Sequence, residues 1–302
     1  GYKVSDIEVV AAYDINSSKV GKDLSQAIFE EPNNTLKFYD VPETGVVVQP
    51  GVVLDGVGKF VKDIIDVVPD SKDFQKSLTN SGAEILINLL PVGSDEAVKF
   101  YAQSAIDTNI GFINCIPVFI ARDENWYNKF RENNVPLIGD DIKSQVGATI
   151  VHRVLAQLFS DRGVKLKNTY QLNVGGNMDF LNMLEEDRLE TKRTSKTSSV
   201  TSVANNGDGI DPDNVRIGPS DYVKWLQDKK KAFIRLEGES FGGAPLNIEV
   251  QLEVWDSPNS AGVTIDAVRY MKYFTKNDDL KSLDLVSAWL MKAPSEAYKD
   301  SD

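Results

Sequence analysis

Cysteine and histidine are almost absent from this sequence of 302 residues, which contains one of each. A single cysteine, Cys115, excludes an intrachain disulfide and a cysteine-based zinc cluster. A single histidine, His152, excludes a metal site built from several histidines. It lies inside a predicted helix, where a histidine-based catalytic triad would be strained. We therefore interpret His152 as a structural residue.

Basic residues are outnumbered by acidic ones, 33 to 45, and long apolar runs are lacking. The formal net charge is −12, which argues against nucleic acid and anionic membrane surfaces as partners. A phosphorylated substrate is still compatible with this charge, provided that lysines gather locally to hold it. No apolar run reaches about 18 residues, so the sequence predicts no membrane-spanning helix. No signal peptide opens the chain, and the cytoplasm is the predicted compartment.

What the sequence does contain is an alternation of apolar runs and helical patterns, over a length that suggests about two domains. Short apolar runs bounded by turn residues predict buried strands at 7–13, 83–90, 111–115 and 135–138. Helical patterns lie at 60–68, 74–78 and 126–130. Ser94 is expected to cap a further helix. This alternation is typical of an α/β fold.

The first predicted strand ends at an acidic residue. The run IEVVAAY (7–13) is followed by Asp14, and a carboxylate in that place binds a ribose hydroxyl in dinucleotide-binding folds. The strand at 83–90 places Leu90 and Pro91 at a carboxyl end of the sheet, where nucleotides bind. A structural turn explains Leu90 and Pro91 equally well.

A glycine-rich phosphate turn is missing beside this acid. Gly56 and Gly58 do not supply it, since no strand precedes them and no third glycine follows. Three explanations stay open: the sequence is a truncated product, residues have been omitted, or the cofactor site is defective.

A second candidate site begins at GDDIKSQVGAT (139–149), which leads into an amphipathic helix through Phe159. Ser144, Gly147 and Thr149 lie at the start of that helix. A helix N-terminus offers unpaired N–H groups and the positive end of the helix dipole, which together suit a phosphate. The alternative interpretation is that Ser144 only caps the helix.

A third candidate site is the stretch GGNMDFLNMLEEDRLETKRTSKTSSV (175–200). Its two glycines and Asn177 would let the backbone pass close to a ligand. Lys192 and Lys196 lie four residues apart, on one face if the helix continues. Two adjacent ammonium groups repel each other and suit an anion between them. The alternative is a solvated charged face paired with the glutamates upstream.

The last third of the chain predicts a sheet and a helix. Alternation of apolar and polar residues over 232–241 and 246–255 indicates an antiparallel strand pair with one buried face. The side chains expected on that face of the second strand are Ile248, Val250, Leu252 and Val254. A helix is predicted over 263–274.

Five motifs, in order along the chain, resemble the myo-inositol-1-phosphate synthase family in its actinobacterial and archaeal form. They are GDDIKSQVGAT, GGNMDFLN…SKTSSV, GPSDYVKWL, LEVWDSPNSAG and WLMKAP, and the resemblance runs from about Ile7 to about Pro294. It implies a Rossmann-like doubly wound sheet with an inserted α+β domain that carries an open antiparallel sheet. The NAD-binding domain would comprise residues 1–145 and 256–302. The catalytic and oligomerisation domain would comprise residues 146–255.

The resemblance also implies an activity, the first step of inositol and phosphoinositide biosynthesis. Enzymes of this family convert glucose 6-phosphate to myo-inositol phosphate by oxidation at C5, enolisation, an intramolecular aldol closure and reduction. NAD is the implied cofactor, and a homotetramer is the implied assembly. Two other interpretations stay open: a sugar-phosphate dehydrogenase, and a catalytically defective assembly subunit, which the missing glycine loop would favour.

Residue roles follow from the same resemblance. Lys192 would shuttle the proton at O5, supported by Asp256, while Lys292 would help to hold O5 and the enolate. Lys230, with Asp228 beside it, would meet O1 and the phosphate. The implied catalytic set is Lys192, Lys196, Lys230, Lys292 and Asp228. The implied phosphate-binding set is Ser144, Gly147 and Thr149.

The implied cofactor contacts come from several segments. Asp14 would bind the adenosine ribose, and Asp140 would lie near the nicotinamide ribose. The full set is Asp14, Leu90, Pro91, Asp140, Asn177, Asp179 and Asp256. A divalent metal or an ammonium ion is compatible with the oxygen ligands among them, which leave its identity open.

Overall fold

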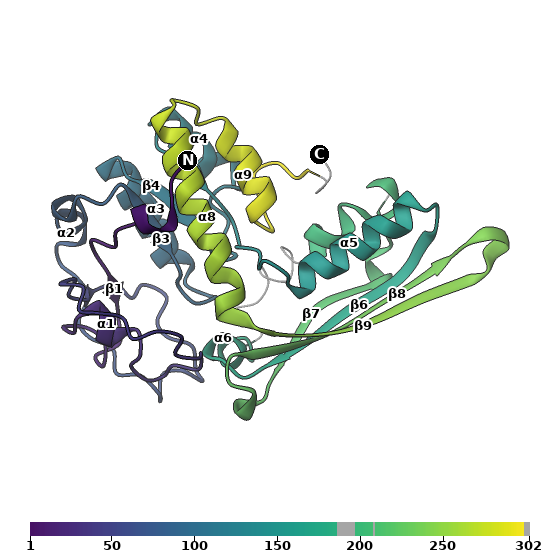
Figure 1. Cartoon of the computed structure of the whole chain (residues 1–302), viewed down its shortest axis with the longest axis horizontal. Helices are drawn as coiled ribbons and strands as arrows, with labels where there is room; N and C mark the ends of the chain where they lie inside the picture. The colour runs from purple at the N-terminus through teal and green to yellow at the C-terminus, as the bar shows by residue number, and fades with distance from the viewer. Residues whose placement is uncertain (186–196, 208, 299–302) are drawn as a thin grey trace.

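The structure is a computed structural model that describes residues 1–185, 197–207 and 209–298. Figure 1 shows two parts: a body of helices and short strands that contains the N-terminus, and a long twisted sheet that extends away from it. The chain passes from the body into the sheet through α5 and returns to the body through α8.

A parallel sheet with strand order β3-β4-β5 forms the centre of the body. Its strands are β3 (Ile85–Asn88), β4 (Gly111–Asn114) and β5 (Leu137–Ile138). Phe112 of β4 packs into a cluster with the helices of one face, and Ile113 packs into a cluster with those of the other. The helices concerned are α2 (Phe74–Ser81), α3 (Asp95–Thr108), α4 (Glu124–Glu132), α8 (Asp256–Lys276) and α9 (Ser282–Leu290). A parallel sheet between two helical layers confirms the predicted doubly wound α/β class.

The first predicted strand is much shorter than expected. Only β1 (Tyr13–Asp14) is a strand, and it pairs in parallel with β2 (Gln49–Pro50). Residues 7–12 have no regular structure, and Val9 and Val10 are 52% and 38% exposed. Within the described residues no strand pairs with 7–12, so this apolar run borders a cavity instead of a sheet neighbour.

The helix predicted over 60–68 is also wrong, because tertiary pairing replaces it. The segment forms turns, in which Val61 and Lys62 donate their N–H groups to the Gly58 carbonyl. Further along, Val68 donates to Ile15, and the Asp66 carbonyl accepts from Ser17. The backbone groups that a helix would have used therefore bond to the segment after β1. The β-branched residues of this stretch are weak helix formers, which makes the outcome reasonable.

The extended part is a four-stranded sheet with strand order β7-β6-β8-β9. Its strands are β6 (Lys165–Gly175), β7 (Val215–Tyr222), β8 (Lys229–Glu239) and β9 (Pro245–Trp255). β6 and β7 are parallel, whereas β8 is antiparallel to both β6 and β9. Helix α5 (Ala148–Asp161) covers one face, and the predicted inward side chains Ile248, Val250 and Leu252 are partly buried against the hydrophobic cluster that α5 forms with β6 and β8.

Short elements complete the fold. Further short α-helices are α1 (Leu24–Ala27) and α6 (Met178–Asn182), residues 197–201 are also helical, and 3-10 turns occur at Val4–Asp6, Ala204–Gly207, Pro212–Asn214, Lys224–Leu226 and Phe241–Gly243. The helix expected over 263–274 is part of α8, which begins earlier, at Asp256.

No helix among the described residues is both long and apolar enough to cross a bilayer.

His152 joins α5 to the sheet, as a structural residue would. Its ring nitrogens contact Gln171 Oε1 at 3.3 Å and Thr169 Oγ1 at 2.6 Å, and the side chain is fully buried. Burial lowers the pKa of His152 to about 4, although the Gln171 contact raises it slightly.

The contribution of His152 to the stability of the folded state should therefore be lost in mild acid. In the unfolded chain histidine protonates near pH 6.5, while folded His152 stays neutral, so the contribution is complete above about pH 6.5 and falls as the pH drops towards 4. Between pH 7.5 and pH 5 we expect the free energy of unfolding of the wild type to fall by about 2 kcal/mol relative to that of a His152→Gln variant, measured by urea unfolding. Burial raises the pKa of Asp140 to about 7, which acts in the opposite direction. The His152→Gln variant keeps Asp140 and serves as the baseline: parallel pH curves for both proteins would contradict the prediction.

Candidate functional site

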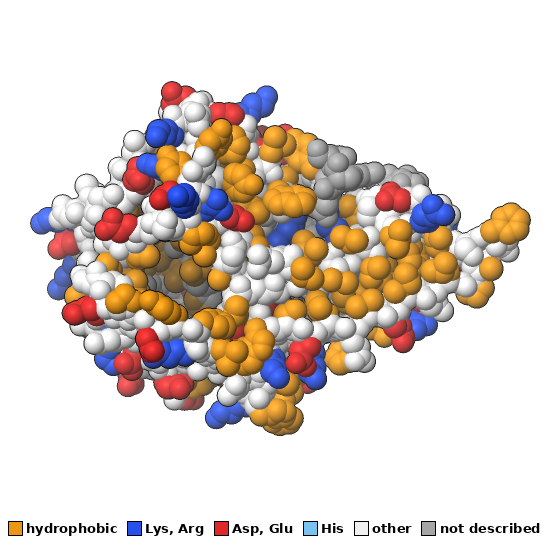
Figure 2. All heavy atoms as spheres, in the orientation of Figure 1, with side chains coloured by type: hydrophobic (Ala, Val, Ile, Leu, Met, Phe, Trp, Pro, Cys, Tyr) orange, Lys and Arg blue, Asp and Glu red, His pale blue; other side chains and the backbone are white. Residues whose placement is uncertain are grey.

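A cavity of about 1200 Å³ lies between the body and the root of the extended sheet. It is lined by 7–16 beside β1, by 85–92 around the end of β3, and by 141–149 leading into α5. The space-filling view shows a hollow bordered by hydrophobic side chains in the part of the molecule that holds β1 and β3 (Figure 2). A large, mostly apolar hollow at the carboxyl ends of parallel strands is where α/β folds bind their ligands.

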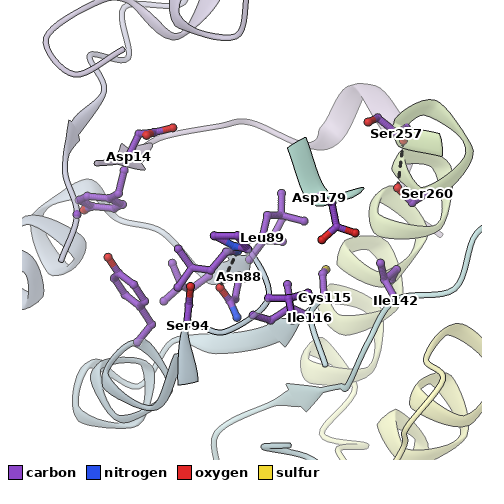
Figure 3. A pocket seen from close by; sticks show the side chains of 18 of the residues that line it. Asp14, Asn88, Leu89, Ser94, Cys115, Ile116, Ile142, Asp179, Ser257 and Ser260 are labelled. Carbon is purple, nitrogen blue, oxygen red and sulfur yellow. Dashed lines mark hydrogen bonds between the residues drawn. The ribbon is translucent and has the colours of Figure 1, made fainter. Parts of the chain in front are cut away.

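Asp14 and Asp179 lie on opposite sides of this cavity (Figure 3). The Asp14 Oδ1 atom accepts the backbone N–H groups of Ile15 and Asn16, and Lys19 Nζ lies 3.5 Å from its Oδ2. Leu90 and Pro91, which follow β3, also line the cavity. The cavity is thus wide enough to separate an acid at the end of β1 from a second acid on α6.

Two lysines from distant elements meet carboxylates in the cavity wall. Lys230 Nζ, on β8, lies 3.2 Å from Asp256 Oδ1 at the start of α8. Lys292 Nζ, just after α9, lies 2.6 Å from Asp141 Oδ1 and also donates to the Ile142 carbonyl. All four side chains line the same cavity. Within the described residues this is where predicted catalytic amines converge.

The charge state of Lys230 follows from its surroundings. Burial works against the ammonium form, but the carboxylates of Asp256, Asp179 and Asp141 outweigh it, so the pKa of Lys230 is raised above its usual value. The group is a fixed cation at neutral pH. Such a cation can stabilise an oxyanion, whereas it is a poor proton acceptor.

The start of α5 forms a separate corner of the cavity, lined by Ser144, Gly147 and Thr149. Gly147 is the N-cap residue and no side chain caps the helix, so the interpretation of Ser144 as a simple cap is wrong. The preceding turn is held by Asn259 of α8, whose Oδ1 accepts the N–H of Val146 and whose carbonyl accepts that of Gln145. The first N–H groups of a long helix are thereby left facing the cavity end, a favourable place for an anion.

Two predicted site residues are turned away from the cavity. The carboxylate of Asp140 is fully buried and accepts the N–H groups of 120–122 and the Asn114 amide. The carboxylate of Asp228 is buried among donors from three segments. Neither side chain lines the cavity. Direct contact of Asp140 with a cofactor, or of Asp228 with a substrate, is therefore not supported by the geometry.

Gly175 and Gly176, which precede Asn177, lie where the chain packs tightly against other parts of the protein. A Cβ on Gly175 would lie 2.4 Å from the Phe180 ring, and one on Gly176 would lie 2.5 Å from the Val223 carbonyl. The backbone at both glycines therefore passes close to other protein segments. Asn177 itself caps α6 through its Oδ1, which accepts from Phe180.

Lys192 and Lys196 lie outside the described residues. Just after them, the Arg122 guanidinium donates to Ser198 Oγ at 3.1 Å, and that of Arg153 donates to the Ser199 carbonyl at 2.8 Å. Among the residues that the structure describes, no group of three or more histidine, cysteine or acidic side chains is arranged to hold a metal ion.

Asn88 is a cavity residue that the sequence reading missed. It ends β3, its Oδ1 accepts the N–H of Leu90, and its Nδ2 donates to Asn114 Oδ1 at 2.8 Å. The available signal was a polar residue inside the otherwise apolar run AEILINLL. A polar residue that interrupts a short apolar run can mark the carboxyl end of a parallel strand, where ligands bind in α/β folds.

Comparison with known proteins gives a consistent result. The model of the family described as "Myo-inositol-1-phosphate synthase" matches residues 147–257. An inositol-3-phosphate synthase of Mycolicibacterium smegmatis is 55% identical, covering 99% of this chain and 83% of that protein. One from Corynebacterium glutamicum is 52% identical, over 99% of this chain and 84% of that protein.

A solved structure agrees with these sequence matches. A myo-inositol-1-phosphate synthase-related protein from Thermotoga maritima superimposes with a TM-score of 0.76 at 26% identity. The match covers 98% of this chain and 83% of that one.

Proposed function

We propose, from the premise that the chain belongs to the myo-inositol-1-phosphate synthase family, that it converts glucose 6-phosphate to a myo-inositol phosphate with NAD as cofactor. The observation that carries the proposal is the convergence of Lys230 and Lys292, each against a carboxylate, in one cavity with the start of α5. An oxidation, an enolisation and an aldol closure each place negative charge on an oxygen. Preorganised cations are what such a sequence of oxyanions requires.

The residues present fit a dinucleotide. The cavity of about 1200 Å³ has Asp14 on one side and the Lys230–Asp256 pair in its wall, and Leu90 and Pro91 also line it. In this proposal Asp14 binds the adenosine ribose, and Asn177, Asp179 and Asp256 surround the nicotinamide end. When bound, NAD would accept the C5 hydride and return it after ring closure, so that no net oxidation occurs.

The chain's own residues would bind and polarise the sugar. The start of α5, with Ser144, Gly147 and Thr149, would bind the phosphate. Lys230, a fixed cation, would stabilise the oxyanion at O1, and Lys292 would hold O5. By family resemblance Lys192 would shuttle the proton at O5, and Lys196 would contact the phosphate.

The assembly and the domain division belong to the same proposal. The face of the extended sheet opposite α5 exposes Leu172 by 41% and Phe233 by 37%, which supports burial of that face in a homotetramer. Residues 146–255 would form the catalytic and oligomerisation domain, and 1–145 with 256–302 would form the NAD-binding domain.

The test is to incubate the protein with glucose 6-phosphate and NAD, and to follow inositol phosphate and NADH together. Inositol phosphate should accumulate over many turnovers without accumulation of NADH. Stoichiometric NADH without inositol phosphate would indicate a sugar-phosphate dehydrogenase instead. No NAD binding in calorimetry would indicate an assembly subunit.

A further inference from the structure

Asp228 has no oxygen left to offer a substrate, although it lies two residues before Lys230. Its side chain belongs to a residue that is only 1% exposed. Its Oδ1 accepts from Asn177 Nδ2 at 3.0 Å and from Ser257 Oγ at 2.8 Å. Its Oδ2 accepts from Thr35 Oγ1 at 2.9 Å and from the Ser257 N–H at 3.1 Å. Both oxygens are therefore used within the protein.

These donors belong to the elements that carry the partners of Lys230. Asn177 is the N-cap of α6, and α6 carries Asp179 in its first turn. Ser257 is the second residue of α8, and α8 begins with Asp256. Thr35 brings in a third segment, far from both in the sequence. One buried carboxylate thus holds the beginnings of two helices, where the positive ends of the helix dipoles favour a negative charge.

The backbone of Asp228 adds a second anchor. Its carbonyl accepts the N–H of Asp256 at 2.9 Å, and its own N–H donates to the Asn34 carbonyl at 3.1 Å. Asp256 is therefore fixed on both sides, through its own N–H and through that of Ser257. The Asp256 carboxylate is the group that lies 3.2 Å from Lys230 Nζ.

We propose that Asp228 is a positioning residue, which fixes the beginnings of α6 and α8 so that Asp179 and Asp256 hold the Lys230 ammonium in place. This inference rests on the proposed function, because the ligand that reports on Lys230 is a hexose 6-phosphate. It replaces the direct contact of Asp228 with substrate that the sequence suggested. The role is indirect, since Asp228 acts on the substrate only through Lys230.

A double-mutant cycle tests this relation. Asp228→Asn keeps the size of the side chain but exchanges one acceptor oxygen for an NH₂ donor, which faces groups that are themselves donors. Lys230→Met removes the ammonium. Binding of D-glucitol 6-phosphate would be measured by calorimetry in the presence of NADH. That ligand has no C1 aldehyde to close a ring, and NADH cannot accept a hydride, so binding is observed without turnover.

In the wild-type background, Asp228→Asn should weaken binding about tenfold, the scale of one lost hydrogen bond to a charged group. In the Lys230→Met background the same change should alter binding by less than about twofold, because the group it positions is gone. Equal weakening in both backgrounds, or no weakening in the wild type, would overturn the inference. Asp221→Asn is the matched control, since Asp221 is exposed and, among the described residues, accepts only from the N–H of Tyr222.

Should Asp228→Asn fail to fold, Ser257→Ala provides the same test, because it removes one donor and leaves the carboxylate and the backbone bonds in place. It should weaken binding about threefold in the wild-type background and leave Lys230→Met unchanged. Failure of the proposed function would give a different experimental result. In that case the wild-type protein neither binds D-glucitol 6-phosphate nor produces inositol phosphate, whatever the cycle gives.

Discussion

Replacing Lys230 with methionine should lower the rate of inositol phosphate formation by about a hundredfold to a thousandfold, the usual loss when one oxyanion-stabilising donor is removed. Its pKa is raised by the surrounding carboxylates against the effect of burial, so the ammonium is charged at neutral pH without any bound ligand. Methionine fills a similar volume and removes the charge. Because the Asp256 side chain is itself 20% exposed, the carboxylate left behind keeps access to water and the fold should survive.

Lys229→Met and Lys231→Met are the matched controls for this experiment. Both lysines are neighbours on β8, both are about 40% exposed or more, and both pair with Glu253 and not with a cavity residue. Their replacement should leave turnover within about twofold of the wild type, as expected for solvated ion pairs. If Lys230→Met is as active as these controls, the amine does not touch the reacting oxygens.

The predictions that succeeded rest on local periodicity. The alternation over 246–255 placed Ile248, Val250 and Leu252 on one face, and in the structure that face is partly buried against the cluster that includes α5 residues. A two-residue period leaves little choice when one face must be buried. Strands β3 and β4 were predicted for a related reason, since a short apolar run between turn residues is typical of a buried strand.

The predictions that failed depend on partners distant in the sequence. Ser94 is the N-cap residue of α3, as expected, but its side chain makes no capping bond. The cap is Asp55 instead, whose two oxygens accept the N–H groups of Glu96 and Ala97. The turns at 60–68 likewise result from pairing with 15–17. Sequence patterns carry no information on which remote loop supplies a bond.

Predictions about the candidate site also differ in outcome. Lysines were assigned from motif resemblance, and the structure brings Lys230 and Lys292 into one cavity, although no local pattern required it. Asp140 and Asp228 come from the same motifs but point into the protein. An acidic residue in a functional motif can bind a ligand or hold the residues that do, and only its hydrogen-bond partners distinguish the two. Lys192 and Lys196 stay predictions.

Replacing Gly176 with alanine should destabilise the fold by about 3 kcal/mol, the upper range for a group forced into packed surroundings. A Cβ there would lie 2.5 Å from both the Gln227 nitrogen and the Val223 carbonyl oxygen, which are backbone atoms that no side-chain rotation can move aside. The strand cannot shift either, because the Gly175 carbonyl next to it accepts the Val223 N–H at 2.8 Å. Relief would have to displace Asn177, and with it the cap of α6 and the bond to Asp228, so catalysis should fall together with stability.

Gly21→Ala separates this crowding from the ordinary cost of losing a glycine. Gly21 has a φ of +87° and open space where a Cβ would be, so alanine there meets only backbone strain of about 1–2 kcal/mol. Urea unfolding of both variants, with turnover measured in parallel, gives the comparison. A Gly176→Ala protein as stable as Gly21→Ala would mean that the turn at 223–227 yields easily. The close approach of Gly176 to that turn would then not be what fixes the positions of α6 and Lys230.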